Sequence, residues 1–313
     1  MKQGKYKNYT LITAGSTYLD IDAYACCVAM AELLRLKGED AIAYSRAPAN
    51  YSVCDSLVED GQISDSLPDG LSSDEARYIV VDVSDPEFLK GSVLLERVVA
   101  IYDHHVGFED YWQSRLGEGA HIEFIGAAAT LVYREWRREG LQDRMSANTA
   151  RLLVAAILDN TLNLTSKNTT REDIEAFREL CEREAIGDEW CAAYFSDVQS
   201  SVVADLKNAL FCDIKTVRNN PYLPSRVAQI TVWDAESVLA RLPDIREWFA
   251  ESADDWMINI IDIKHGCSYF VCDSENYQRR LEGVFDVRFE SGVARSSTSY
   301  LRKEIIKKTV FWV

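Results

Sequence analysis

The sequence predicts an α/β fold with two domains. In the first part of the chain, short apolar runs typical of strands alternate with helical segments. This pattern indicates a mostly parallel sheet flanked by helices. A second set of strand-like runs begins near residue 213 and predicts a smaller, mixed α/β domain. We place the boundary at residue 198, which gives domains 1–198 and 199–313, and we expect an active site in the cleft between them.

The elements of the first domain follow from its apolar pattern. Strands are expected at Thr10–Thr13, Ala41–Ser45, Tyr78–Val83 and Val98–Tyr102. A helix is expected over Ala23–Leu36 and should end at Gly38, because glycine is favoured just past a helix. Further helices are expected at Thr130–Arg138, Ala147–Leu158 and Arg171–Glu184, with one or two more and the linker inside 189–211.

The second domain is expected to form a smaller sheet. Its strands are predicted at Ile214–Val217, Val227–Val232, Met257–Ile263 and Ser268–Val271. Helical stretches at Ala235–Arg241 and Ile245–Ala250 interrupt them. The basic tail, residues 301–310, alternates in a way that predicts an edge strand guarded by lysines.

Composition narrows the possible partners. The net charge of −16 argues against a broad nucleic-acid surface, because phosphate backbones are bound by basic stripes. No run reaches the roughly 18 apolar residues of a membrane span. No signal-peptide core follows the N-terminus, so we expect a cytoplasmic protein. The eight cysteines lack zinc-site spacing and are expected to be reduced thiols. A small anionic ligand, met by a local patch of Lys and Arg, fits these limits.

Acidic and histidine side chains follow the predicted strands of the first domain or interrupt an apolar helix. They are Asp20, Asp22, Asp82, Asp103, His104, His105 and Asp159. Carboxylates and imidazoles are ligands of Mg, Mn and Fe-type ions. The carboxyl ends of parallel strands meet at one edge of a sheet. Several carboxylates in one cleft need cations, and two divalent ions would neutralise them. The sequence therefore predicts a two-metal phosphoesterase.

Several of these residues also have an ordinary structural interpretation. Asp20 or Asp22 could cap the following helix, although one cap accounts for only one aspartate. Asp82 lies beside good turn residues, and Asp159 could be a helix-end residue that faces water.

The adjacent histidines could be a simple loop pair. Neighbouring strand residues point to opposite faces, so we do not expect both rings to bind one ion. One ring should be a metal ligand and the other should reach the substrate. Asp103 would then orient an imidazole through its second nitrogen.

These segments, in this order, resemble the DHH phosphoesterase superfamily, named for the Asp-His-His that stands here at residues 103–105. The other matching motifs are Gly15–Asp22, Val81-Asp82 and Ala156–Asp159. Residues 165–173 are similar to the segment after the last motif in family II inorganic pyrophosphatases. The second domain is similar to the one these share with exopolyphosphatases. The glycine-rich, His-containing motif of the branch that acts on nucleotides is absent at Lys264-His265-Gly266.

The resemblance implies a role for each matching residue. The metal ligands would be Asp20, Asp22, Asp82, His104 and Asp159, with Asp82 bridging two ions. Asp103 and His105 would be catalytic, with His105 contacting phosphate or the leaving group. The substrate-binding residues would be Lys215, Arg302 and Lys303, with Arg295 and Ser299 nearby in the basic tail. The cofactors implied are two divalent ions, Mn or Mg first, with Co left open.

Two departures from the family bear on the substrate. Ser16 stands where family II pyrophosphatases have a histidine ligand, and exopolyphosphatases also lack that histidine. Leu301 replaces the usual serine of the C-terminal motif, and Ser299 is the candidate replacement.

We therefore expect a metal-bridged hydroxide to hydrolyse short inorganic polyphosphate. Pyrophosphate is the alternative substrate. A nucleotide phosphodiesterase and a non-catalytic phosphate-binding module are the further alternatives. Whether the chain forms a homodimer is left open.

Overall fold

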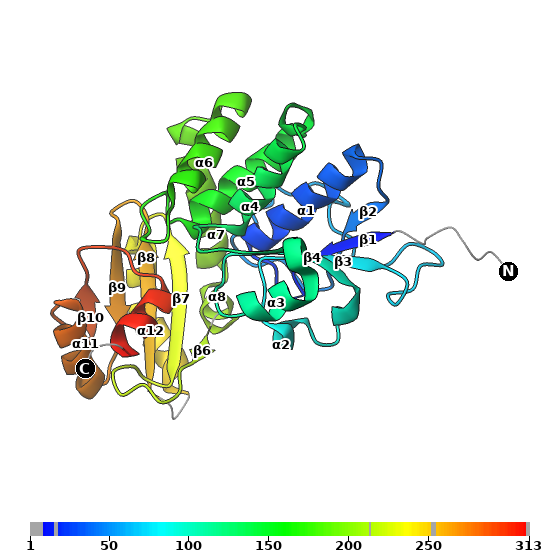
Figure 1. Ribbon diagram of the computed structural model, residues 1–313. Coiled ribbons are helices and arrows are strands. Elements are labelled where there is room, and N and C mark those ends of the chain that lie inside the picture. Colours follow the sequence, from blue (N-terminus) through cyan, green and yellow to red (C-terminus); the bar gives the residue numbers. More distant parts are fainter. Residues whose placement is uncertain (1–8, 16–17, 213, 252–254, 311–313) are drawn as a thin grey trace. The chain divides into compact units, whose positions relative to one another are not determined.

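The fold is taken from a computed structural model, which describes residues 9–15, 18–212, 214–251 and 255–310 (Figure 1). The chain divides into two compact units, Met1–Cys191 and Ala192–Val313. Helix α7, Asp188–Ala204, spans this division. Among the described residues, no helix is both long and apolar enough to cross a membrane.

The first unit contains a five-stranded sheet in the order β2-β1-β3-β4-β5, and all its pairings are parallel. The strands are β1 (Thr10–Thr13), β2 (Ala41–Ala43), β3 (Arg77–Val81), β4 (Val98–Asp103) and β5 (Ala120–Ile122). The predicted parallel sheet is confirmed. Strand β5 was not predicted, because its three half-buried residues form no apolar run.

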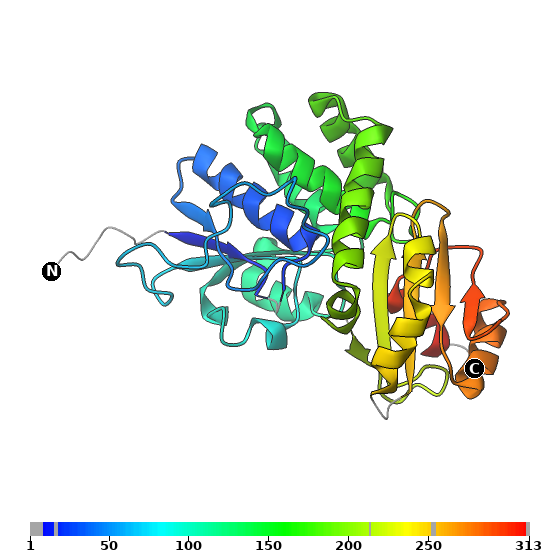
Figure 2. The same ribbon diagram turned by 180° about the vertical axis from the view of Figure 1, so that it is seen from behind.

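Helices cover both faces of the first sheet, as Figures 1 and 2 show. Helices α1 (Ile21–Leu36) and α4 (Ala128–Arg138) lie on one face, while α3 (Glu109–Leu116) lies on the other. Every side chain of α5 (Ala147–Asn160) from Leu152 to Leu158 is buried, because α1, α4 and α6 (Arg171–Glu184) pack around it. The short helices are α2 (Pro86–Leu89), η1 (Leu95–Arg97), η2 (Gly117–Gly119) and η3 (Gln142–Arg144).

The second unit contains a mixed sheet in the order β10-β9-β8-β7-β6, in which only β7 and β8 are parallel. Its strands are β6 (Lys215–Thr216), β7 (Arg226–Val232), β8 (Trp256–Asp262), β9 (Cys267–Val271) and β10 (Val293–Arg295). Its remaining helices are α8 (Leu206–Cys212), α9 (Glu236–Leu239), α10 (Leu242–Ala250), α11 (Glu275–Phe285) and α12 (Arg302–Val310). The predicted mixed domain is confirmed.

Both faces of the second sheet are also covered. Met257 and Phe270 belong to one core cluster with residues of α11 and α12. The ring of Trp256, the neighbour of Met257 in β8, lies 4.7 Å from the ring of Phe249 in α10. Because neighbouring strand residues point to opposite faces, α10 covers the other side.

The basic tail corrects one prediction. Residues 302–310 form helix α12 and not an edge strand. The buried side chains are Arg302, Ile305 and Thr309, a helical spacing that places one face on the core. The carboxylate of Glu304 accepts the backbone N–H of Leu301 at 2.8 Å and so caps the helix start. The strand prediction failed because the apolar and polar residues around the two central isoleucines alternate in a way that is also compatible with a strand.

Candidate metal centre

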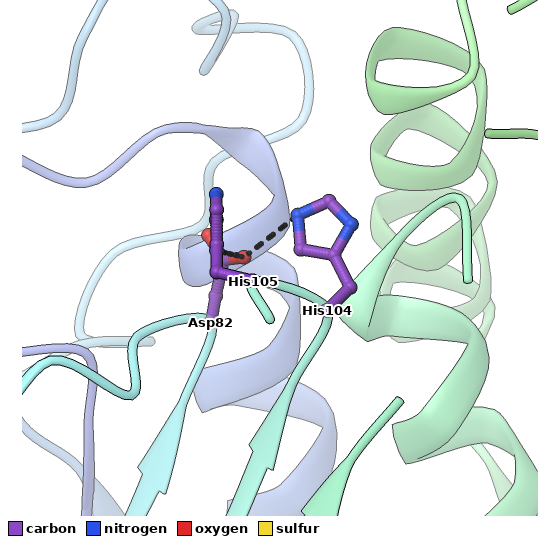
Figure 3. Close-up of side chains that lie close together, drawn as sticks. All are labelled: Asp82, His104 and His105. Atoms are coloured by element: carbon purple, nitrogen blue, oxygen red, sulfur yellow. Dashed lines mark ion pairs between the residues drawn. The ribbon is translucent and has the colours of Figure 1, made fainter. Parts of the chain in front are cut away.

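The core of the predicted site comes from the ends of two neighbouring parallel strands. Val81, the last residue of β3, pairs with Tyr102 of β4, so the residues that follow both strands emerge side by side. Asp82 follows β3, and its backbone N–H donates to the carbonyl oxygen of Tyr102 at 2.8 Å. Residues 104 and 105 follow β4. Figure 3 shows the three side chains at this sheet edge.

Both imidazoles face the carboxylate of Asp82. Its Oδ1 lies 3.4 Å from Nε2 of His104 and 3.9 Å from Nδ1 of His105. One ligand atom from each of the three residues lies within 4.8 Å of the others. The expectation that the two rings point to opposite faces is wrong, because β4 ends at Asp103 and the extended alternation ends with it.

The environment of His104 fixes which of its nitrogens can bind a metal. The ring is buried, and its Nδ1 lies 3.2 Å from the carbonyl oxygen of Ile125. A carbonyl can only accept, so Nδ1 carries the proton and Nε2 presents a lone pair toward Asp82. A divalent cation placed here could be bound by both Nε2 of His104 and the carboxylate of Asp82.

Asp103 orients His105 and not the buried histidine. Its Oδ1 accepts the backbone N–H of His105 at 3.0 Å and lies 2.9 Å from that residue's Nδ1. Burial acts to raise the pKa of Asp103, but the hydrogen bonds from His105 hold it below its ordinary value. The side chain of His105 is about half exposed.

The backbone of Asp82 is strained. Its φ is 56°, in the left-handed region that side-chain-bearing residues rarely adopt. Such strain persists only where surrounding structure enforces it, and it clusters at functional sites.

The two acids of the first motif differ in role. Asp20 is the N-cap of α1 and accepts the N–H of Ala23 at 3.0 Å. Asp22 does not lie in the preceding turn as expected, since α1 already begins at Ile21. Its fully buried carboxylate accepts the N–H groups of Ala128 and Ala129, each at 2.8 Å, and so also caps α4.

Electrostatics link Asp22 to its acidic neighbours. Burial and the charge of Asp20 raise the pKa of Asp22 to about 8, despite the two backbone hydrogen bonds. The charges of both Asp22 and Asp82 act on Cys26, one turn further along α1. A cation in this neighbourhood would restore the ionised form of Asp22.

Asp159 is the penultimate residue of α5 and is half-buried. Helix α5 packs against α1, which carries the first-motif acids. Just beyond Asp159, three consecutive residues have left-handed φ values: Leu162 at 51°, Asn163 at 56° and Leu164 at 62°. This strained turn redirects the chain toward the segment similar to that of the pyrophosphatases.

The predicted substrate-binding residues separate into two groups within the second unit. Lys215 pairs with Val227 across β6 and β7, and the guanidinium of the buried Arg302 donates to the carbonyl oxygen of Val227 at 3.3 Å. Lys303 is the next residue, exposed in the first turn of α12.

Arg295 and Ser299 lie at the other end of the sheet. The Oγ of Ser299 lies 3.4 Å from the carbonyl oxygen of Cys267, and the side chain of Arg295 also contacts Cys267. Cys267 pairs with the last residue of β8, whereas Val227 pairs with the second. Ser16 lies outside the described residues.

Sequence reasoning missed the partner that fixes His104. The partner is the backbone carbonyl of Ile125, and because every residue has such a carbonyl, the residue type at this position could not indicate the contact. It also missed Asp173, whose buried carboxylate supports the same loop. The Thr170-x-x-Asp173 spacing at the start of α6 is a recognisable capping-box pattern and could have indicated that residue.

Along nearly its whole length, the chain is similar to proteins named as probable manganese-dependent inorganic pyrophosphatases. It is 24% identical to the probable manganese-dependent inorganic pyrophosphatase of Staphylococcus haemolyticus over 295 residues, covering 91% of this chain and 92% of that protein. It is 26% identical to the protein of the same name from Staphylococcus aureus over 306 residues, covering 92% and 93%. No family model matches the chain.

A solved structure supports the fold. A Methanococcus jannaschii protein assigned to the family II inorganic pyrophosphatases aligns with a TM-score of 0.64 and 19% identity, covering 96% of this chain and 98% of that one. The resemblance expected from the motifs is confirmed by these relatives and by the shared fold.

Proposed function

We propose that this chain is an enzyme that hydrolyses phosphoanhydride bonds with the help of divalent metal ions. One observation carries the proposal: Nε2 of the buried His104 faces the strained carboxylate of Asp82 at 3.4 Å. Manganese or magnesium suits such a mixed set of carboxylate and imidazole ligands. The names of the curated relatives support the same class of reaction.

The residues that would hold two metal ions are those of the strand ends and adjoining helices: Asp20, Asp22, Asp82, His104 and Asp159. When bound, such ions polarise phosphoryl oxygens and lower the pKa of a water molecule. In Asp22, Oδ1 accepts both the N–H of Ala129 and the thiol of Cys26 at 3.5 Å. Its Oδ2 accepts the N–H of Ala128 and would offer its second lone pair to a ligand.

His105 and Asp103 would act on the substrate as a pair. Asp103 holds Nδ1 of His105, which leaves the exposed Nε2 to exchange a proton with the leaving oxygen or to bind phosphate. The buried carboxylate fixes the direction of the ring.

The basic residues would stabilise the charge that develops on the phosphoryl oxygens. Lys215 pairs with Val227 in the sheet, Arg302 donates to the carbonyl oxygen of Val227, and Lys303 follows directly, which supports these three as the phosphate-binding group. Arg295 and Ser299 gather around Cys267, so their part in substrate binding stays a prediction to be tested by substitution.

Within this class, short inorganic polyphosphate is the first substrate proposed and pyrophosphate the second. Ser16, in place of the family's histidine ligand, favours polyphosphate. The names of the relatives favour pyrophosphate. At 24% and 26% identity, however, those names state the substrate of the relatives and do not fix the substrate of this chain.

Phosphate release should be measured with Mn²⁺ or Mg²⁺ from pyrophosphate, tripolyphosphate, long polyphosphate and pAp, with Asp82→Ala as the control. Release that favours tripolyphosphate and is lost in the variant supports the proposal. Preference for pyrophosphate or pAp would change the substrate but keep the site. No metal-dependent release from any of the four would overturn the proposed enzyme.

A further inference from the structure

The carbonyl that fixes His104 belongs to a peptide group that is held from its other side as well. The oxygen of the Ile125–Gly126 peptide lies 3.2 Å from Nδ1 of His104. The N–H of the same peptide donates to Oδ2 of Asp173 at 2.9 Å. One planar peptide therefore lies between a buried carboxylate and the buried imidazole.

Asp173 is held rigidly. It is the third residue of α6 and is fully buried. Its Oδ2 also accepts the N–H and the hydroxyl of Thr170, each at 2.7 Å, and its Oδ1 accepts the hydroxyl of Thr130 at 2.6 Å. Four hydrogen bonds from two helices and a loop fix this carboxylate, and charge-assisted bonds of this kind are the strong ones.

The loop is shaped for this close approach. A Cβ atom on Gly126 would lie 2.7 Å from Oδ2 of Asp173 and 2.6 Å from Cγ2 of Thr161. Real Cβ atoms do not approach other atoms this closely, so only glycine fits. Two residues further on, Asp22 accepts the N–H groups of Ala128 and Ala129. Two buried carboxylates, one from α1 and one from α6, thus hold a single five-residue stretch.

We propose that Asp173 is a positioning residue for the metal centre, acting on His104 through the Ile125–Gly126 peptide. The inference rests on the proposed function only in taking His104 as a metal ligand. A carboxylate on the N–H side polarises the peptide, because hydrogen bonds in a chain strengthen one another. The carbonyl becomes a better acceptor for Nδ1–H, which keeps the proton there and makes Nε2 a stronger ligand.

Helix capping alone accounts for only part of this geometry. Thr170 and Asp173 form a reciprocal capping box, which is a common way to stabilise a helix start. The box requires the bonds between these two residues. It requires neither the bond to Gly126 nor the bond to Thr130.

Two variants separate the two roles. Asp173→Asn preserves the shape and an acceptor for Gly126 but removes the charge. Thr170→Ala breaks the capping box and leaves the bond from Gly126 to Asp173. For each variant, Mn²⁺ affinity is measured by calorimetry, thermal stability by circular dichroism, and the His104 tautomer by ¹⁵N NMR of the metal-free protein.

We expect Asp173→Asn to weaken Mn²⁺ binding by about threefold to tenfold, somewhat less than a direct partner of a ligand, and to shift the ¹⁵N resonances of His104. Thr170→Ala should lower thermal stability and leave both readouts unchanged. Equal losses in the two variants, or an unchanged His104 spectrum in Asp173→Asn, would overturn the inference. Because the spectrum needs neither metal nor substrate, it decides the inference even if the proposed enzyme activity fails.

Discussion

The two units each contain a parallel strand pair that ends in an acid and a histidine. At the end of β4, Asp103 accepts the N–H of His105 at 3.0 Å and lies 2.9 Å from its Nδ1. At the end of β8, Asp262 accepts the N–H of His265 at 2.9 Å and lies 3.0 Å from its Nδ1. The same local arrangement thus occurs twice, in two sheets.

The surroundings of the two pairs differ. In the second unit, the third member of the group is Asp234, and Nζ of Lys264 lies 2.9 Å from its Oδ2. The other oxygen of Asp262 accepts the N–H of Ala235 at 3.1 Å. In this group the ammonium of Lys264 therefore supplies the positive charge, and the hydrogen bonds of Asp262 connect the turns that follow β7 and β8.

In the first unit, a second imidazole takes the place of the lysine. Nε2 of the buried His104 lies 3.4 Å from the carboxylate of Asp82, and Asp82, His104 and His105 form a group that could hold a metal ion. The comparison teaches that a strand-end acid and histidine do not define a metal site by themselves. What matters is whether the protein supplies the compensating charge.

The largest expected difference between the two regions is in activity. Asp82→Ala should lower phosphate release by roughly a thousandfold, about 4 kcal/mol, because the proposed bridging ligand and the metal chemistry that would depend on it are lost. Asp234→Ala, the corresponding acid of the second unit, should leave release nearly unchanged. A comparable loss in both variants would break the comparison.

The next effect concerns metal affinity. His104→Gln should weaken Mn²⁺ binding on the order of 100-fold, because a buried ligand is removed. His265→Gln should leave the affinity within about twofold, a change too small to count as a lost ligand. Isothermal titration of both variants tests this, and a strong loss in His265→Gln would instead indicate an ion in the second unit.

A smaller effect is expected for the loop that supports His104, which has no counterpart among the hydrogen bonds of His265 to residues that the structure describes. Gly126→Ala should destabilise the fold by about 1–3 kcal/mol, because the new methyl group meets Thr161 and Asp173. Gly283→Ala, in α11 with open space around its Cβ, should not destabilise the protein. Urea denaturation compares the two, and equal midpoints would contradict the tight packing at Gly126.

The smallest expected effect is at the lysine itself. Lys264→Met removes an exposed ion pair, and such pairs contribute little to stability. The urea midpoint and the number of tightly bound Mn²⁺ ions should both stay as in the unsubstituted protein. An additional bound ion in this variant would show that Lys264 alone keeps the second group from being a metal site.

Local patterns allowed much of the fold to be predicted. The bounds of α6 match the prediction, because Thr170 and Glu184 delimit a clear apolar period. The tail failed, because the alternation around Ile305 and Ile306 is compatible with two periods. Strand β10 and helix α11 were not predicted at all. Only the tertiary structure shows that their apolar residues pack into the core of the second unit.

The sequence by itself determined that acids and histidines follow the apolar runs that form the strands. Because these strands are parallel, the positions that follow them come to one edge of the sheet. Only the tertiary structure decided what each does. Asp22 caps a helix 106 residues away, and the position of the proton on the His104 ring depends on a carbonyl 21 residues away. Backbone N–H and C=O groups are the same in every residue but proline, so only folding determines which of them meet a given side chain.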